Sequence, residues 1–399
     1  MKILVLAPSP FFQLRGTPIA VRLLTKVLSA EGHEVHILTY HEGEPVDIPN
    51  VTISRIPALP GIKNIKPGPS WKKIVSDLAM FVKLLRMVRR NRFDLIHAVE
   101  ESVFMALVIK KISGIPFVYD LDSLLSQQLS EKYKALQVLK PVLEFFEKKA
   151  VKESLGAVTV CKSLEKSVLK CDVHKLVVRL EDITLLPEKS AEEDQAENRM
   201  MIEPVAMYIG NLERYQGIDL LLEAFQIAVR QIPEARLVII GGSEPDITHY
   251  RKRAQDLEIG EKTRFLGPKP IDQMRSLFNQ AQILVSPRIQ GQNTPMKIYS
   301  YLDSGKPVLA TDLPTHTQVL DNQIAFMASP TAEAMAEGMV TLFKDNHLRD
   351  NLARLARERV QEEYCFEAYQ KKLINFYSKI ESRVLGGHEI RKKDSRKRR

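Results

Sequence analysis

The stretch GQNTPMKIYSYLDSGKPVLAT, residues 291–311, has the pattern of a loop, a short helix and a buried strand. Thr294-Pro295 is typical of a helix start, because a threonine hydroxyl caps free amides and proline fits the first helical position. Gly305 is expected to end this helix. The unpaired amides and dipole of such a helix start favour a bound anion, which Lys297, one turn in, would contact. The alternative is an ordinary capped helix with a solvated lysine.

The rest of the chain alternates apolar strand patterns with helix patterns. We expect strands at residues 3–7, 34–40, 51–57, 94–99, 116–121 and 157–160, and again at 205–210, 235–242, 263–267, 281–287 and 307–311. Helices are expected at 18–30, 71–90, 102–112 and 139–154, between the later strands, and as several helices over 332–380. Near-continuous apolar strands separated by helices indicate parallel sheets covered on both faces. The pattern predicts an α/β protein with two doubly wound, Rossmann-like domains facing a central cleft.

Composition sets the domain boundaries and excludes several classes of protein. The first domain is expected at 1–187 and the second at 204–364, joined by a polar, acidic linker at 188–203. The three cysteines fit no zinc spacing and indicate a reduced, cytoplasmic protein. Apolar runs are too short to span a membrane, and prolines interrupt the apolar start, so we expect a first strand there and no signal peptide.

Glycine-rich turns after the expected strands supply further candidate ligand contacts. Gly16 and Thr17 precede Pro18 and repeat the proline-opened helix start in the first domain. In the second domain, the turn after residue 209 contains Gly210, Asn211, Arg214 and Gln216, and Gly241 follows the next strand. Two facing helix starts would hold one polyanion, although chance repetition of Thr-Pro is the alternative. The chain contains neither a dinucleotide-binding G-x-G-x-x-G nor a P-loop motif.

The sequence resembles the family-4 retaining glycosyltransferases, which have the two-domain GT-B fold. The resemblance covers nearly the whole chain and includes GHEVHILTY, FDLIHA, YIGNLERYQGIDLLLEAF, RLVIIGG and NTPMKIYSYLDSGKPVLAT. It implies a nucleotide-sugar donor in the second domain, an acceptor in the first, and a helix at 365–385 that crosses back to the first domain. By position it implies donor contacts from Gly16, Asn293, Thr294 and Pro295, and a catalytic role for Lys297.

The chain departs from the family pattern at several site positions. The two family glutamates, eight positions apart, correspond to Gln292 and Ser300. Asn211 and Gln216 replace the Arg and Lys that usually contact the donor pyrophosphate, so Arg214, Arg288 or Lys297 would have to compensate. Asp122 stands near the position of a family histidine and is the other candidate catalytic residue.

The resemblance implies transfer of a hexose, with retention, from a nucleotide sugar to a lipid-linked or polysaccharide acceptor in cell-envelope or exopolysaccharide synthesis. Retaining transfer relies mainly on positioning and on stabilising the leaving diphosphate. Neither a metal nor a cofactor is expected. The alternatives are a non-catalytic GT-B protein that binds a sugar nucleotide or glycan as a partner of an active enzyme, and a sugar-nucleotide epimerase.

Positive charge is concentrated in two segments. The net charge is +9, yet Trp71–Arg92 carries seven Lys and Arg against Asp77, and Arg391–Arg399 carries seven against Asp394. Residues 386–399 are expected to be a disordered basic tail. Residues 71–90 predict an amphipathic helix with Ile74, Leu78 and Val82 on the apolar face that covers the sheet, and with a solvated basic face. The alternative is peripheral contact with an anionic membrane on its inner face; no specific nucleic-acid binding is expected.

Overall fold

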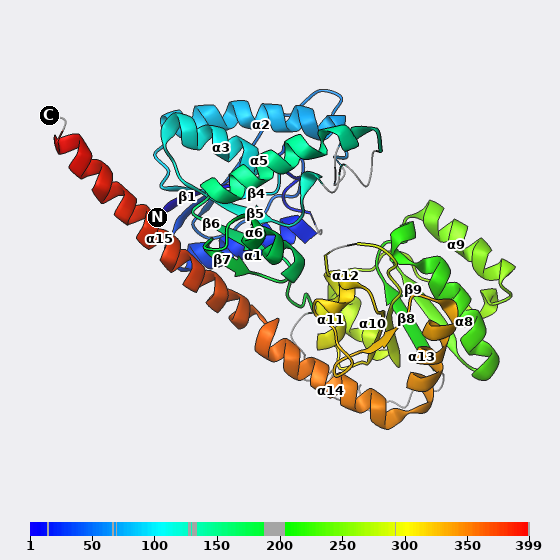
Figure 1. The fold of residues 1–399 in the computed structure, drawn as a ribbon. Helices are drawn as coiled ribbons and strands as arrows, with labels where there is room; N and C mark the ends of the chain where they lie inside the picture. The colour runs from blue at the N-terminus through cyan, green and yellow to red at the C-terminus, as the bar shows by residue number, and fades with distance from the viewer. Residues whose placement is uncertain are drawn as a thin grey trace. The chain divides into compact units, whose positions relative to one another are not determined.

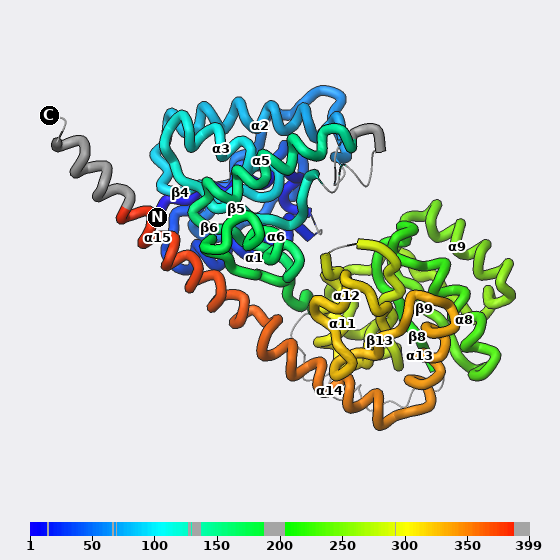
Figure 2. Tube along the Cα trace, in the orientation of Figure 1, coloured from blue at the N-terminus to red at the C-terminus, as the bar shows by residue number. Residues whose placement is uncertain are grey.

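The computed structural model describes residues 1–13, 16–65, 68, 70–126, 129, 134–186, 204–291 and 293–397. The chain forms two compact units, Met1–Glu181 together with Tyr369–Arg399, and Asp182–Ala368 (Figures 1 and 2). Each unit contains one parallel sheet covered by helices, so the predicted α/β fold with two Rossmann-like domains is confirmed. The acidic linker predicted at 188–203 lies outside the described residues.

The first unit contains a seven-stranded sheet in the order β3-β2-β1-β4-β5-β6-β7. Its strands are β1 (Lys2–Ala7), β2 (Glu34–Thr39), β3 (Val51–Arg55), β4 (Leu95–Val99), β5 (Phe117–Leu121), β6 (Gly156–Thr159) and β7 (Val177–Arg179). Its helices are α1 (Gly16–Ala30), α2 (Trp71–Arg90), α3 (Ser102–Ser113), the 3-10 helix η1 (Lys134–Leu139), α5 (Lys140–Glu153) and α6 (Lys162–Cys171). α2, α3, α5 and α6 share one core cluster with the sheet, whereas α1 lies on its other side (Figure 1).

The second unit contains a six-stranded sheet in the order β10-β9-β8-β11-β12-β13. Its strands are β8 (Val205–Ile209), β9 (Arg236–Ile240), β10 (Thr263–Phe265), β11 (Ile283–Ser286), β12 (Val308–Thr311) and β13 (Phe326–Ala328). Its helices are η2 (Arg214–Gln216), α8 (Ile218–Gln231), α9 (Glu244–Asp256), η3 (Gly260–Lys262), η4 (Ile271–Gln273), α10 (Met274–Asn279), α11 (Lys297–Asp303), α12 (Pro314–Thr317), α13 (Ala332–Lys344) and α14 (Asn346–Glu363). α8, α9 and α13 pack in one core cluster, and α10, α11 and α14 pack in another.

The last helix, α15 (Phe366–Lys397), belongs to the first unit although it follows the second in sequence. The Tyr377 hydroxyl lies 2.7 Å from His97 Nδ1, and His97 Nε2 lies 2.9 Å from Asp120 Oδ2. A β-carbon added at Gly156 would lie 2.9 Å from the Phe376 ring, so α15 packs tightly over β6. The helix extends through Lys397, which differs from the disordered tail predicted at 386–399.

The orientation predicted for α2 is wrong. Ser76, Met80 and Leu84 are its buried residues, whereas Ile74 and Leu78, which the sequence placed against the sheet, are exposed. The bounds of the helix agree with the prediction. The face that packs against the sheet differs from the predicted one, because charged side chains on this inner face pair with groups inside the unit.

Candidate active site

The centre of the site in the second unit is the point where the order of strands reverses. β8 and β11 pair in parallel there, with β9 on one side and β12 on the other. The chain leaves β8 at Gly210 and leaves β11 at Pro287, which leads directly to Arg288. Ligands of open α/β sheets bind beyond the carboxyl ends of the strands at such a switch point. This is where the sequence placed its donor-binding residues.

Gly210 and Gly241 let the loops after β8 and β9 approach each other closely. A β-carbon at Gly241, whose φ is +107°, would lie 2.1 Å from the Gly210 carbonyl oxygen. A β-carbon at Gly210 would lie 3.3 Å from Lys297 Nζ. The fold therefore brings these predicted donor-binding glycines together with the predicted catalytic lysine.

Lys297 is the first residue of α11, and its ammonium group is buried. Nζ lies 3.9 Å from the centroid of the Tyr208 ring and 3.4 Å from Gln216 Oε1. Burial lowers the pKa of Lys297 well below its usual value, and the nearby charge of Arg288 lowers it further. The cation–π contact and one long hydrogen bond are weak substitutes for the water that this charge has lost.

Arg288 places a second cation beside Lys297. Its Nε donates to the Gln290 carbonyl at 2.7 Å, its Nη1 donates to the Asn293 carbonyl at 3.3 Å, and its guanidinium lies 5.1 Å from the Tyr215 ring centroid. Burial lowers the pKa of Arg288. These main-chain contacts fix the guanidinium without neutralising it.

Within the described part of the chain, neither Lys297 nor Arg288 forms an ion pair with a carboxylate. Their positive potential reaches His316, whose pKa is lowered to about 4, chiefly by burial and further by these two cations. A buried charge without a counter-ion is costly, and an anionic ligand would remove that cost. The arrangement is therefore suited to a diphosphate.

The predicted helix start at Thr294-Pro295 is wrong. α11 begins at Lys297, preceded by Met296, which provides no side-chain cap, and the amide of Ile298 donates to the Pro295 carbonyl at 2.9 Å. Thr294 is buried, and its hydroxyl has no hydrogen-bond partner among the described residues. A turn thus precedes α11 where a threonine cap was expected. The cationic side chains of Lys297 and Arg288 also lie at this point, and a diphosphate held by main-chain amides at this helix stays a prediction.

Two other residues predicted to bind the donor, Asn293 and Ser300, contact groups of the same unit. The Asn293 carbonyl accepts from Arg288 and, at 2.8 Å, from the Thr315 hydroxyl. The Ser300 hydroxyl accepts a hydrogen bond from the Leu185 amide at 3.2 Å, so it contacts the segment with which the second unit begins. Gln292 lies outside the described residues.

The turn after β8 places its predicted residues differently. Gln216 is buried and contacts Lys297, as described above. Asn211 is exposed and donates to the Tyr215 hydroxyl at 3.4 Å, and Arg214 is also exposed. Arg288, which the sequence offered only as one of three compensating cations, is the one that accompanies Lys297.

In the first unit, α1 begins at Gly16, two residues before the start predicted at Pro18, so Gly16 and Thr17 lie in its first turn. A β-carbon at Gly16 would meet nothing within 4 Å, so the chain itself does not require glycine there. Asp122 follows β5 in a bend and is half-buried. The roles of these three residues remain predictions.

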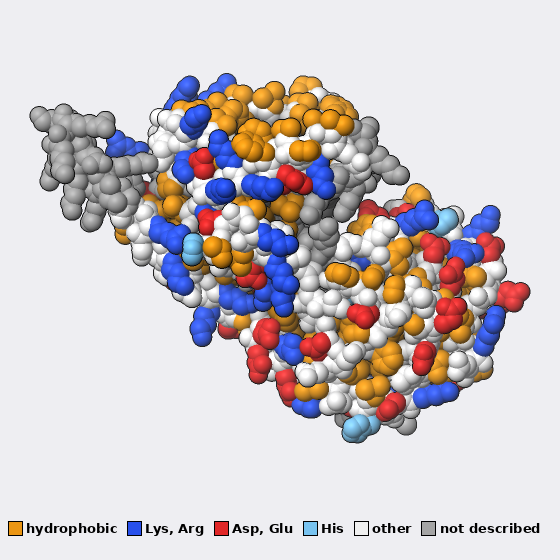
Figure 3. All heavy atoms as spheres, viewed as in Figure 1, with side chains coloured by type: hydrophobic (Ala, Val, Ile, Leu, Met, Phe, Trp, Pro, Cys, Tyr) orange, Lys and Arg blue, Asp and Glu red, His pale blue; other side chains and the backbone are white. Residues whose placement is uncertain are grey.

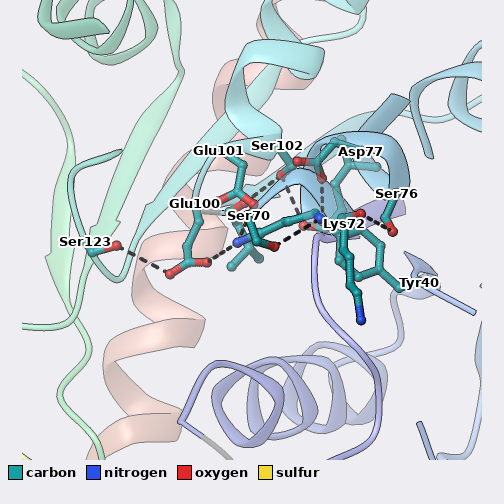
Figure 4. A network of polar contacts seen from close by, with 12 residues as sticks. Tyr40, Ser70, Lys72, Ser76, Asp77, Glu100, Glu101, Ser102 and Ser123 are labelled. Carbon is teal, nitrogen blue, oxygen red and sulfur yellow. Dashed lines mark hydrogen bonds and ion pairs between the residues drawn. The ribbon is translucent and has the colours of Figure 1, made fainter. Parts of the chain in front are cut away.

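A buried polar cluster at the carboxyl ends of β2 and β4 was not predicted from the sequence (Figure 4). The Tyr40 hydroxyl donates to Asp77 Oδ1 at 2.5 Å, and Lys73 Nζ lies 2.6 Å from Glu101 Oε1 and 3.8 Å from Glu100 Oε2. Burial raises the pKa of Asp77 to about 6 and that of Glu101 to about 8. The signal available in the sequence was Glu100-Glu101 directly after a buried strand, opposite a lysine and an aspartate one turn apart.

Among the described residues, no group of histidine, cysteine or carboxylate side chains has an arrangement that would hold a metal ion. None of the helices in the same ranges is both long and apolar enough to cross a bilayer.

Comparisons with known proteins agree with this fold. Residues 14–180 match the family model described as Glycosyltransferase Family 4, and residues 189–359 match the one described as Glycosyl transferases group 1. Sulfoquinovosyl transferase SQD2 of Arabidopsis thaliana is 22% identical, over 96% of this chain and 76% of that protein. A phosphatidyl-myo-inositol mannosyltransferase of Mycolicibacterium smegmatis is 21% identical, over 95% of this chain and 94% of that protein.

Solved structures show the same fold. Sucrose-phosphate synthase from Thermosynechococcus elongatus has a TM-score of 0.77 at 20% identity and covers 96% of this chain and 100% of that chain. HepE of Anabaena, solved in complex with UDP, has a TM-score of 0.72 at 15% identity and covers 95% and 100%. The fold and the switch-point site define a GT-B glycosyltransferase. Because the two family models together span most of both units, the chain belongs to the family-4 glycosyltransferases.

Proposed function

We propose that this glycosyltransferase moves a hexose from a nucleotide sugar, with retention of anomeric configuration, to a lipid-linked or polysaccharide acceptor in cell-envelope or exopolysaccharide synthesis. The observation that carries the proposal is the pair of buried cations, Lys297 and Arg288, without a carboxylate counter-ion among the described residues. The donor diphosphate supplies the missing negative charge. The acceptor part draws on the printed name of the mycobacterial relative, which contains a phosphoinositide lipid.

In the proposed reaction the acceptor hydroxyl oxygen bonds to the anomeric carbon on the face that the diphosphate leaves. The bond between the anomeric carbon and the phosphate oxygen breaks, and a phosphate oxygen takes the acceptor proton. Lys297 and Arg288 stabilise the charge that develops on the leaving diphosphate, which is a dominant contribution in this kind of catalysis. No protein base is needed in this scheme.

We place the enzyme in the cytoplasm, working at the inner face of a membrane, because a lipid-linked acceptor would be presented there. The acceptor would bind to the first unit, where Glu100 directly follows β4, which pairs with β1 at the reversal of strand order. Ser123 donates to Glu100 at 3.4 Å, and Asp122 is its neighbour in the same bend. Carboxylates at such a position are suited to accept hydrogen bonds from acceptor hydroxyl groups.

A panel of UDP-, GDP- and ADP-sugars in a thermal-shift assay tests the donor. We expect one nucleotide class to stabilise the protein and to be hydrolysed slowly without acceptor. Lys297→Met should abolish the hydrolysis and reduce the stabilisation, whereas Lys269→Met, at an exposed lysine of the same unit, should change neither. The proposal fails if none of the nucleotide sugars stabilises the wild type.

One observation favours the second candidate, a non-catalytic sugar-nucleotide or glycan-binding partner protein. Ser300, which stands where the family has a glutamate, contacts the Leu185 amide of its own unit. Binding of one nucleotide sugar without hydrolysis, and without transfer to any lipid or glycan extract, would select this candidate.

A further inference from the structure

α2 presents apolar side chains to solvent and charged side chains to the interior. Ile74 and Leu78 are 69% and 64% exposed. One turn of helix separates Lys73 from Asp77 on the inner face, where they contact Glu101 and Tyr40. In an ordinary sheet-covering helix the apolar stripe faces the sheet. The outward stripe on α2 therefore needs another partner.

The outward stripe continues across neighbouring helices. Of the seventeen large hydrophobic side chains exposed among the described residues, twelve lie on α2, α3, η1 and α5. α2 contacts α3 and α3 contacts α5, with the Phe104 and Phe146 rings 6.5 Å apart. Figure 3 shows hydrophobic side chains gathered where Figure 1 draws these helices. The apolar patch is defined here by Trp71, Ile74, Leu78, Ile112, Val142 and Phe145.

The helices that carry the apolar patch are rich in positive charge. α2, α3 and α5 together contain twelve Lys and Arg against four Asp and Glu. Asp77 and Glu147, two of these four acids, point inward, where Glu147 accepts from the Ser126 amide and hydroxyl. Lys73 also points inward, to Glu101, so the other charged side chains of the three helices are eleven Lys and Arg against Glu144 and Glu153.

We propose that the apolar patch docks on an anionic lipid bilayer, with Ile74, Leu78 and Phe145 inserted among the acyl chains and the surrounding cations at the headgroups. This inference rests on the proposed function, because it supplies the surface on which a lipid-linked acceptor would be met. An amphipathic helix with a cationic polar face and apolar residues opposite binds in the plane of the interface, and tryptophan is favoured at that depth.

A second copy of the chain fits this patch less well than a bilayer does. Two copies would bring like charges together around the apolar residues, and such repulsion opposes association. An anionic membrane provides the opposite charge and an apolar interior at once.

Vesicle flotation with the full-length protein tests the proposal. The probes are vesicles of phosphatidylglycerol with phosphatidylcholine, and vesicles of phosphatidylcholine alone. We expect the wild type to float with the anionic vesicles and the double variant Ile74→Ser/Leu78→Ser to bind them at least about tenfold more weakly, a loss of about 1.4 kcal/mol. Val173→Ser, at a residue 72% exposed outside these helices, is the matched control and should bind like the wild type.

Salt separates apolar insertion from simple electrostatic adsorption. At about 0.5 M salt, which screens exposed charges within a few ångströms, the wild type should keep part of its binding to the anionic vesicles. The double variant should then lose binding entirely. Equal binding of double variant and wild type would overturn the proposal, and so would a wild type that binds neither kind of vesicle.

The oligomeric state and the donor binding of the double variant complete the test. If the wild type is a dimer in solution and the double variant a monomer, the patch is an interface between copies and the proposal is overturned. Donor-induced thermal stabilisation of the double variant shows that the variant is folded and reports on the proposed function independently. Loss of vesicle binding with normal donor stabilisation supports the docking surface, whereas a wild type without donor stabilisation contradicts the proposed function alone.

Discussion

Without a bound anion, the surroundings of Lys297 favour its neutral amine over its charged form. Burial and the charge of Arg288 lower its pKa, and a bound diphosphate would raise that pKa again. Binding of UDP at alkaline pH should therefore take up a fraction of a proton, and the affinity should decrease as pH rises. Calorimetric titration in two buffers of different ionisation enthalpy measures this uptake.

Substitutions at Lys297 separate charge from titration. Lys297→Arg keeps a permanent charge and should abolish the proton uptake, whereas Lys297→Met should weaken UDP binding roughly 10- to 100-fold, the worth of one hydrogen bond to a charged group. Lys269→Arg is the control, since Lys269 is exposed in the same unit. Unchanged uptake in Lys297→Arg would mean that another group titrates.

His316, whose pKa the same two cations help to lower, should make the stability of the second unit depend on pH. It is fully buried, with Nε2 2.9 Å from the Ser286 hydroxyl, and its pKa is lowered from 6.5 to about 4, chiefly by burial. The unfolded chain therefore binds a proton below about pH 6.5 that the folded chain does not bind. Stability contributed by neutral His316 is present above that pH and is lost as pH falls toward 4, by about 3 kcal/mol in all.

Urea unfolding followed by circular dichroism at pH 4.5 and pH 7 measures this loss. His316→Asn should unfold more easily than the wild type at pH 7 and should depend less on pH. His249→Asn, at an exposed histidine in the same unit, should keep the wild-type slope. A wild-type slope in His316→Asn would assign the pH dependence to other groups.

At the scale of elements, α2 shows what sequence periodicity can and cannot predict. Its bounds, Trp71–Arg90, agree with the prediction, because twenty residues of helical pattern are an unambiguous signal. Its buried face does not agree, since Asp77 and Lys73 find partners on β-strand ends that are distant in sequence. Such pairing depends on tertiary contacts, which periodicity does not contain.

α11 illustrates a similar limit at a shorter length. The strands before and after α11 were predicted from the sequence. Gly305, whose φ is +77°, follows the helix as predicted. The helix begins later than expected, at Lys297, because Thr294 is buried and does not cap it. Lys297 could be predicted from its place one turn into the expected helix and from the family resemblance, whereas the sequence offered Arg288 only as one of three compensating cations.

Asp77 should make the stability of the first unit depend on pH in the opposite sense to His316. Burial raises its pKa from 3.8 to about 6, so the folded chain binds a proton that the unfolded chain releases. Stability is therefore fully present below about pH 4 and decreases as pH rises to about 6. Asp77→Asn should flatten this decrease, because the amide oxygen still accepts from Tyr40 and carries no charge.

Urea midpoints measured between pH 4 and pH 7 test this expectation. Asp47→Asn removes a carboxylate that is exposed in the same unit and should leave the dependence unchanged. A steeper decrease in Asp77→Asn than in the wild type would show that ionised Asp77 stabilises the cluster.

At the scale of the whole molecule, the chain builds the first unit from both of its ends. The unit ends at Glu181 and resumes at Tyr369, so α15 completes a core that was begun by the first 181 residues. Proteins with two such units commonly unfold in more than one step. The donor should stabilise the unit that contains Lys297 and Arg288, and α15 should stabilise the other.

Calorimetry of the full chain tests this division of stability. Tyr377→Phe removes the hydroxyl that lies 2.7 Å from His97 Nδ1 and leaves a buried nitrogen without its partner, at a cost of about 1–3 kcal/mol. We expect it to lower one unfolding transition and UDP to raise the other, since a ligand stabilises the unit that binds it. Ser378→Ala is the control, because Ser378 is exposed and donates only within its own helix, to Asn375. If Tyr377→Phe lowers the transition that UDP raises, the two units unfold together and the assignment of α15 to the stability of the first alone is wrong.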